Sequence, residues 1–339
     1  MTRLIRDIQD SFHKFQINLQ GKTVLTEAAT GNYVCTPIIA AMAGAKVYAI
    51  AKESKYGTID QIENEVSTIA KCLKVEKKIS IIKSLNEVNL SGIDIVTNTG
   101  FVRPIDKSFI DRLKSDCVIP LMWEPWEFRP GEFDLDYATR KGIKVYGTNE
   151  ADSRLQTMNY IGLTVLYFLL KEKRSPLSTK VLVIGCEKFN HAIEVVLKKQ
   201  GYPVNSFLTN FYNKAEIKEY DTIVVAEHTT SKMIIGDTSE SLINNSDLSI
   251  DHLIIHIAGS VDFDSTICCH YPEKPASFGY MSYTADFIDP VAVIDLHTAG
   301  LNVAEGMLKS KEIGLKGFAF KKHMETNYPA LAFDNIKYW

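Results

Sequence analysis

The stretch Lys180–Val204, KVLVIGCEKFNHAIEVVLKKQGYPV, decides the fold. It begins with an apolar, β-branched run that ends in Gly185, continues with a helical pattern, and reaches a second apolar start after Gly201. This order predicts a strand, a tight turn, a helix and a second parallel strand, as in the mononucleotide-binding half of a doubly wound sheet. The turn of such a unit reads G-x-G-x-x-G, whereas here Gly185–Asn190 reads GCEKFN.

Only the first glycine of that pattern is present, and each glycine has its own role in turning, in approaching the pyrophosphate and in packing helix on strand. Glu187 puts a negative charge where the pyrophosphate would lie, although a carboxylate is itself favourable at a helix N-terminus. Asn190 adds bulk between helix and strand. Residues 205–210, after the second strand, include neither an acid for a ribose hydroxyl nor an arginine for a 2′-phosphate. These departures favour weak, altered or absent dinucleotide binding.

The composition is that of a globular protein, with 45% hydrophobic and 23% charged residues, and 339 residues suffice for two domains. A net charge of −3 and a pI near 6.3 give no reason to expect nucleic acid or a membrane surface as a partner. The longest apolar stretch, Tyr160–Leu170, is too short to span a bilayer, and the N-terminus has helical spacing rather than a signal-peptide pattern. We therefore expect a cytoplasmic protein whose partner is a small molecule.

Six cysteines are scattered along the chain without a C-x-x-C pair, which indicates reduced thiols rather than a disulfide framework. The vicinal pair Cys268–Cys269, followed by His270, suggests a metal ligand set. Because no second ligand pair stands at a suitable spacing, we expect buried strand residues there and no metal site.

Strand and helix patterns alternate along the chain, which predicts an α/β fold of two doubly wound parallel-sheet domains. Capping boxes at Thr58 and Ser153 predict helix starts, the second for the most apolar helix, Arg154–Lys171. So apolar a helix should be buried between domains or between subunits, and it favours a homodimer. After Lys180 we expect strands at 180–184, 204–207, 222–226, 253–257 and 292–295, and a helix over 303–311.

Several segments support a family assignment: DIVTNTG at 94–100, FDLDYATRKGIKV at 133–145, IVVAEH at 223–228, IHIAGSVD at 255–262 and VIDLHTAG at 293–300. In this order they resemble segments of the D-2-hydroxyacid dehydrogenase superfamily, which includes formate, glycerate and phosphoglycerate dehydrogenases. The resemblance implies a flavodoxin-like outer, substrate-binding domain, 1–150 plus 299–339, and an inserted Rossmann-like domain, 151–298. It also implies NAD or NADP as cofactor.

The same resemblance implies roles for individual residues. His297 corresponds to the family's acid/base, and Glu273 is the nearest match to the glutamate that pairs with that histidine. For His297 the alternative is a structural imidazole paired with Asp295 or with backbone. Substrate contacts are implied for the loop Asn98, Thr99 and Gly100, and cofactor contacts for Gly185, Cys186, Glu187, His228 and Ala258.

One residue of the family is missing, the arginine that grips the substrate carboxylate, because Ala258-Gly259-Ser260 stands in its place. Arg103, beside the 98–100 loop, or Arg129, in the loop Trp123–Gly131, is a candidate replacement. That loop also carries Glu124 among aromatic residues, which suits a ligand with an apolar face; a packed hinge with its own salt bridges is the equal alternative.

Two functional hypotheses follow from the sequence. The first is a divergent NAD(P)-dependent oxidoreductase that acts on a small 2-hydroxy or 2-keto acid with His297 as acid/base. The second is a cofactor-independent relative: a ligand-binding or regulatory protein, or an enzyme of changed chemistry that uses the Trp123–Gly131 loop. The His297 segment favours the first, and the missing arginine and glycines favour the second.

Overall fold

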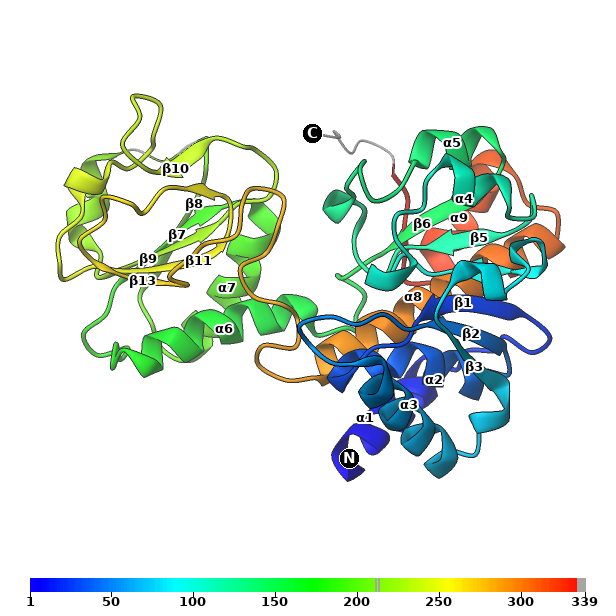
Figure 1. The fold of residues 1–339 in the computed structure, drawn as a ribbon. Coiled ribbons are helices and arrows are strands. Elements are labelled where there is room, and N and C mark those ends of the chain that lie inside the picture. Colours follow the sequence, from blue (N-terminus) through cyan, green and yellow to red (C-terminus); the bar gives the residue numbers. More distant parts are fainter. Residues whose placement is uncertain (211, 213, 334–339) are drawn as a thin grey trace. The chain divides into compact units, whose positions relative to one another are not determined.

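A computed structural model describes residues 1–210, 212 and 214–333 of the chain. The chain forms two compact units, unit 1 from Met1–Leu155 with Pro290–Trp339, and unit 2 from Gln156–Asp289. In Figure 1 unit 2 is the part coloured green and yellow that contains β7 and β11. The chain returns to unit 1 at Pro290, ahead of the expected boundary at 298/299, so His297 belongs to unit 1.

Both units have the predicted α/β architecture. The sheet of unit 1 has the order β14-β6-β5-β4-β1-β2-β3, and every pairing in it is parallel except that of β14 with β6. Its strands are β1 (Thr23–Glu27), β2 (Lys46–Ile50), β3 (Ile79–Ile82), β4 (Ile95–Val96), β5 (Val118–Pro120), β6 (Lys144–Thr148) and β14 (Ala330–Leu331). Its helices are α1 (Thr2–Phe15), α2 (Cys35–Met42), α3 (Ile59–Cys72), α4 (Lys107–Asp111), α5 (Leu135–Arg140), α8 (Val291–Glu312) and α9 (Gly317–Asn327).

Side chains of the unit 1 strands alternate between two cores because successive residues point to opposite faces of a sheet. Val24 lies in the core that holds residues of α1, α2, α3, α8 and α9, whereas Leu25 lies in the core that holds residues of α4 and α5. The strand order reverses between β1 and β4. In open α/β sheets ligands bind at the carboxyl ends of the strands where the order reverses. We therefore expect a site of unit 1 at the carboxyl ends of β1 and β4.

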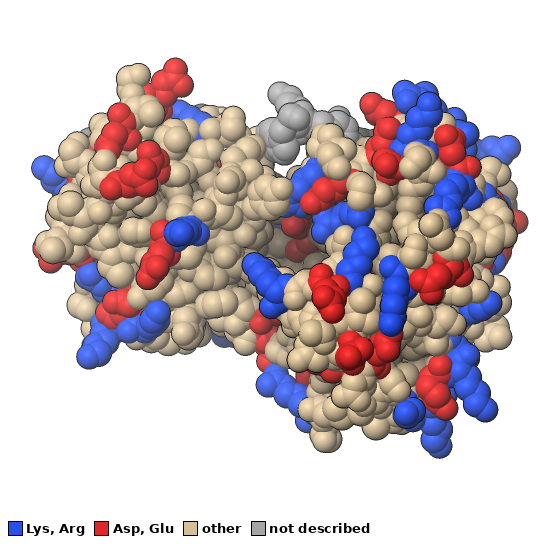
Figure 2. All heavy atoms as spheres, in the orientation of Figure 1, with Lys and Arg blue, Asp and Glu red and all other residues tan. Residues whose placement is uncertain are grey.

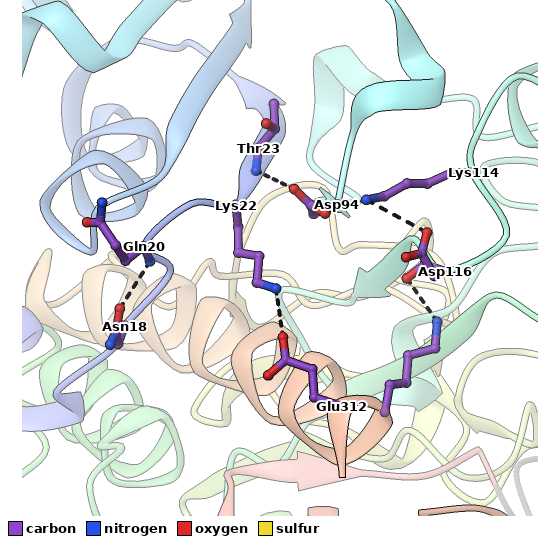
Figure 3. A network of polar contacts seen from close by, with 9 residues as sticks. Asn18, Gln20, Lys22, Thr23, Asp94, Lys114, Asp116 and Glu312 are labelled. Atoms are coloured by element: carbon purple, nitrogen blue, oxygen red, sulfur yellow. Dashed lines mark hydrogen bonds and ion pairs between the residues drawn. The ribbon is translucent and has the colours of Figure 1, made fainter. Parts of the chain in front are cut away.

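The amino edge of the same sheet is held by an ionic network (Figure 3). Asp94, just before β4, accepts a 2.6 Å hydrogen bond from the backbone N–H of Thr23 and pairs with Lys114. Lys22 pairs at 2.7 Å with Glu312 at the end of α8. These contacts join β1, β4 and α8 at the edge opposite the predicted ligand side, so their role is structural.

Unit 2 has a parallel sheet of order β13-β11-β9-β7-β8 and a small β10-β12 pair. Its strands are β7 (Val181–Gly185), β8 (Val204–Leu208), β9 (Thr222–Ala226), β10 (Met233–Ile235), β11 (Leu253–Ala258), β12 (Ser260–Val261) and β13 (Cys269–Tyr271), and its helices are α6 (Thr157–Lys171) and α7 (Glu187–Lys199). The strand order reverses between β7 and β9, so the Lys180–Val204 stretch lies at the centre of this unit as predicted.

Helix starts show which local signals were sufficient. The capping box at Thr58 is confirmed, because its side chain accepts from Gln61 and the Gln61 side chain bonds back. The box at Ser153 is wrong: α6 begins at Thr157, and its N-cap Gln156 makes no capping hydrogen bond. Residues 152–155 instead form a turn in unit 1, where Arg154 pairs with Asp152 at 2.8 Å.

The predicted strand at 292–295 is also wrong, because α8 is one continuous helix over Val291–Glu312 that includes the expected 303–311 helix. Its side chains are buried around almost the whole circumference, from Ala292 to Leu308. A helix that is buried on all sides has no apolar period, so a short apolar run at its start cannot be told from a strand.

Surface charge and hydropathy agree with the composition. Figure 2 shows Lys and Arg side chains interspersed with Asp and Glu side chains on the visible face. Within the described residues, none of the helices combines the length and the apolar content that crossing a bilayer requires.

Candidate functional site

The carboxyl edge of unit 1 gathers polar side chains where β1 and β4 end. Glu27 is the last residue of β1, and Thr97, Asn98 and Thr99 follow β4 directly. All four are buried. The Thr99 hydroxyl accepts from the Glu27 N–H at 3.2 Å, Thr97 lies 2.9 Å from Thr99, and the Asn98 side-chain oxygen accepts from the Met122 N–H at 2.9 Å. The predicted 98–100 loop therefore lies at the expected edge of the sheet.

Glu27 is a site residue that sequence reasoning missed. Its side chain is 8% exposed, and its Oε2 accepts a hydrogen bond from the Phe101 N–H at 3.0 Å. Burial raises the pKa of Glu27, while hydrogen bonds from the Phe101 and Gly100 backbone and the nearby charge of Arg103 partly lower it. A carboxyl group with a raised pKa is suited to proton transfer near neutral pH.

Arg103 approaches the same point from the other side of the loop. A Cβ atom on Gly100 would lie 3.2 Å from Glu27 Oε2 and 3.7 Å from Arg103 Nη2, so both side chains converge on this glycine. Arg103 Nη1 pairs with Glu132, and the guanidinium lies 5.3 Å from the centre of the Trp123 ring.

The Trp123–Gly131 loop borders this cluster. Glu124 is buried and accepts from the Glu150 N–H at 3.0 Å, and Arg129 donates to the Glu127 carbonyl at 2.8 Å. Both therefore make local contacts that hold the loop. A cavity of about 340 Å³ opens beside it, lined by Phe128, Phe133 and Glu132 among others. Arg103 and Glu124 thus come from adjoining segments, but among the described contacts Arg129 does not reach Glu27.

His297 lies inside α8 and not after a strand. It is 4% exposed, its Nδ1 is 2.6 Å from the Thr36 hydroxyl, and the Tyr33 ring meets it edge-on at 5.7 Å. Asp295, its expected structural partner, pairs with Lys14 at 2.5 Å instead. The imidazole is therefore held by α2 and its preceding turn within the core of unit 1.

Glu273 belongs to unit 2, whereas His297 belongs to unit 1. It is exposed and follows β13 and the cis peptide Tyr271–Pro272. Their expected pairing therefore stays a prediction.

The turn of unit 2 is tight. Gly185 ends β7, and a Cβ there would lie 2.0 Å from the Ala226 carbonyl oxygen, which explains why this one glycine remains. Cys186 is buried and is the N-cap of α7, and Glu187 is exposed in its first turn. Asn190, at the third glycine position, donates at 3.0 Å to the Phe207 carbonyl and so ties α7 to β8.

The carboxyl end of β9 holds a second residue that sequence reasoning missed, Glu227. It is 2% exposed and accepts hydrogen bonds from the Thr209 hydroxyl at 2.5 Å and the Thr229 hydroxyl at 2.6 Å. Ala258, which ends β11, accepts from the Glu227 N–H at 2.9 Å, and the His228 ring meets Phe189 at 4.6 Å.

Both missed residues share a sequence signal, an acid directly after an apolar strand, in TVLTE at 23–27 and TIVVAE at 222–227. The residues at the unit 2 turn do not fit the dinucleotide that the fold implies. A buried carboxylate lies at the reversal of strand order, and Thr209 after β8 replaces the acid that would bind a ribose.

In the described part of the chain, no group of three or more His, Cys, Asp or Glu side chains is placed to hold a metal ion. Cys268 is buried but precedes the edge strand β13, whereas Cys269 in that strand is exposed and His270 is half-buried, so the expectation of buried strand residues is wrong.

No sequence model of a protein family matches the chain, and neither does the sequence of any curated protein. Solved structures do match. A dipicolinate synthase chain from Bacillus subtilis has 13% identity and a TM-score of 0.56, over 87% of this chain and 99% of that chain. The corresponding dipicolinate synthase chain from Bacillus halodurans has 12% identity and a TM-score of 0.53, over 88% and 100%. A D-lactate dehydrogenase from Treponema pallidum has 11% identity and a TM-score of 0.47, over 88% and 98%.

The chain thus shares its fold with the two dipicolinate synthase chains, and the predicted α/β fold class is confirmed. Sequence identities this low support a conclusion about architecture alone, and function must be argued from the site.

Proposed function

We propose that this protein is a cofactor-independent relative of the dehydrogenases that binds a small hydroxy or keto acid in unit 1 and transfers a proton to or from it. The observation that carries the proposal is the convergence of Glu27 and Arg103 on Gly100, at the reversal of strand order. Two proteins of similar fold are named dipicolinate synthase, after a small acid, and this supports the ligand class.

Arg103 supplies the positive charge that such a ligand needs. A guanidinium binds a carboxylate or polarises an adjacent carbonyl oxygen, because its N–H groups form a rigid fork. Trp123 adds a second donor, since its buried indole Nε1 has no hydrogen-bond partner among the described residues. A buried donor without an acceptor is costly, and a ligand oxygen would remove that cost.

Glu27 then acts as the acid/base. Its carboxylate takes a proton from the carbon next to the carbonyl, the electron pair moves to the carbonyl oxygen, and Arg103 stabilises the negative charge that develops there. Return of the proton to carbon or to oxygen completes the cycle without a hydride donor. The raised pKa of Glu27 makes it a stronger base than an exposed carboxylate.

The NAD(P)-dependent reaction with His297 as acid/base remains a prediction that the geometry favours less. The imidazole of His297 is bonded to Thr36 inside the helical core, and the unit 2 turn does not fit a dinucleotide. Dimerisation through α6 and a cytoplasmic location likewise remain predictions.

The test is exchange of carbon-bound protons in D₂O, followed by NMR, with small 2-keto acids such as pyruvate as probes. The wild-type protein should accelerate exchange next to the carbonyl. Glu27→Gln should lower the rate by roughly 10²-fold or more while ligand binding persists, and Arg103→Lys should weaken binding. Arg140→Lys, at an exposed arginine of α5, is the matched control. Neither binding nor exchange with a folded protein would refute the proposal.

A further inference from the structure

In unit 2, the Glu227 side chain of the protein itself lies where a nucleotide-binding sheet would hold its ligand. β7 lies between β8 and β9 in the sheet, and the strand order reverses beside it. Thr209 follows β8, Glu227 follows β9, and the two side chains are joined by a 2.5 Å hydrogen bond. A bond between residues just past the two flanking strands must pass over the end of β7, which is the Gly185 turn. The Thr209 N–H also donates to the Gly185 carbonyl at 3.3 Å, which fixes the bond close to that turn.

The carboxylate at this position is fully engaged. Its Oε2 accepts from Thr209, and its Oε1 accepts from both the hydroxyl and the N–H of Thr229, at 2.6 and 2.5 Å. It accepts three hydrogen bonds and donates none of them, as an ionised carboxylate does. With 2% of the residue exposed, the charge is shielded little by solvent.

A dinucleotide would bring its pyrophosphate to this same turn. Its negative charges would then face a buried negative charge, and like charges repel strongly where water is excluded. The threonine hydroxyls that otherwise suit phosphate oxygens already donate to Glu227. Binding would have to break these bonds and leave the buried carboxylate without donors, which is strongly unfavourable.

We infer that Glu227 closes the dinucleotide crevice of unit 2, so that the protein keeps the nucleotide-binding fold but excludes NAD and NADP. Glu187 and Asn190 weaken binding at the turn, but Glu227 is the side chain that fills the crevice, because the strand–turn–helix backbone and Gly185 are retained. Removal of the negative charge should therefore restore binding to a measurable degree. This inference concerns unit 2 alone and does not depend on the reaction proposed for unit 1.

The experiment is a fluorescence titration of the full chain with NADH. Wild type and Glu240→Gln, a control at an exposed glutamate of the same unit, should show no saturation up to millimolar cofactor. Glu227→Gln, which keeps the shape of the side chain, and Glu227→Ser, which also makes room, should bind at least tenfold more tightly than wild type. Circular dichroism and thermal melting establish that each variant is folded.

Saturable binding of NADH to the wild type in the micromolar range would overturn the inference. So would two folded Glu227 variants that bind no better than Glu240→Gln. Neither result would bear on proton exchange by Glu27, so the two proposals fail separately.

Discussion

Replacement of Glu27 by glutamine should make unit 1 more stable above neutral pH. Burial is the largest effect on this carboxyl group, and it raises the pKa above the usual value even though Arg103 and the backbone N–H groups of Gly100 and Phe101 act in the opposite direction. The folded protein therefore holds a proton on Glu27 more tightly than the unfolded chain does. It follows that the wild type loses stability as the pH rises from the unfolded pKa through the folded pKa.

The size of the stability difference depends on how far the pKa of Glu27 is raised. Each unit by which the pKa is raised amounts to about 1.4 kcal/mol of differential stability. For a domain of 150–250 residues, 1 kcal/mol moves the melting temperature by roughly 2–4 °C. Glutamine keeps an oxygen to accept from the Phe101 N–H but carries no charge. The variant should thus melt above wild type at pH 8, by roughly 2–4 °C for each kcal/mol that the buried charge costs.

The assay is thermal melting of wild type, Glu27→Gln and the control Glu53→Gln, at an exposed glutamate of unit 1, between pH 4 and pH 8. The difference between wild type and Glu27→Gln should shrink towards pH 4, where the wild-type carboxyl group is protonated. Glu53→Gln should follow the wild-type curve. A Glu27→Gln protein that is less stable at pH 8, or that differs equally at both ends, would falsify the argument that the buried charge is costly.

Two further predictions concern stability. His256 is fully buried, with Nδ1 2.7 Å from the Ser282 hydroxyl, and burial lowers the pKa of its imidazole to about 4. The neutral imidazole of His256 makes its full contribution to the free energy of unfolding above pH 6.5, and up to about 3 kcal/mol of stability is lost as the pH falls towards 4. An NMR titration midpoint of His256 above pH 6 would contradict this. Asp94→Ala should lower the free energy of unfolding by about 1–3 kcal/mol in chemical denaturation, because Lys114 and a backbone N–H lose their acceptor. Asp116→Ala, at an exposed carboxylate 3.7 Å from Lys114, should change it by under about 0.5 kcal/mol.

The sequence was sufficient to predict the architecture because the architecture depends on hydrophobic periodicity and on the glycines that end strands and helices. The apolar run into Gly185 and the helical spacing after it are local patterns, and they predicted the centre of unit 2 correctly. The same reasoning failed in α8, where burial on all sides removes the period. It also failed at Ser153, because the local turn around Asp152 and Arg154 prevailed over the capping box.

The candidate site was predicted only in part, because it depends on which strands lie side by side. The 98–100 loop and Arg103 were identified through a family resemblance that covers the loop after β4. Glu27 is 72 residues from Thr99 along the chain, and the two come together because β1 pairs with β4. No local pattern indicates that pairing, so Glu27 was not predicted as a site residue.

The two buried glutamates show how the same position in a sheet can lead to different chemistry. Glu27 is the last residue of β1 and Glu227 directly follows β9, each at the reversal of strand order of its own unit. Glu227 accepts hydrogen bonds from two threonine hydroxyls and a backbone N–H, and this full set of donors favours a structural role. Glu27 accepts from backbone N–H groups, and no side-chain hydroxyl bonds its carboxylate in the described part of the chain. With fewer donors the charged form of Glu27 is less stabilised and burial raises its pKa, so its protonation state can change during a reaction.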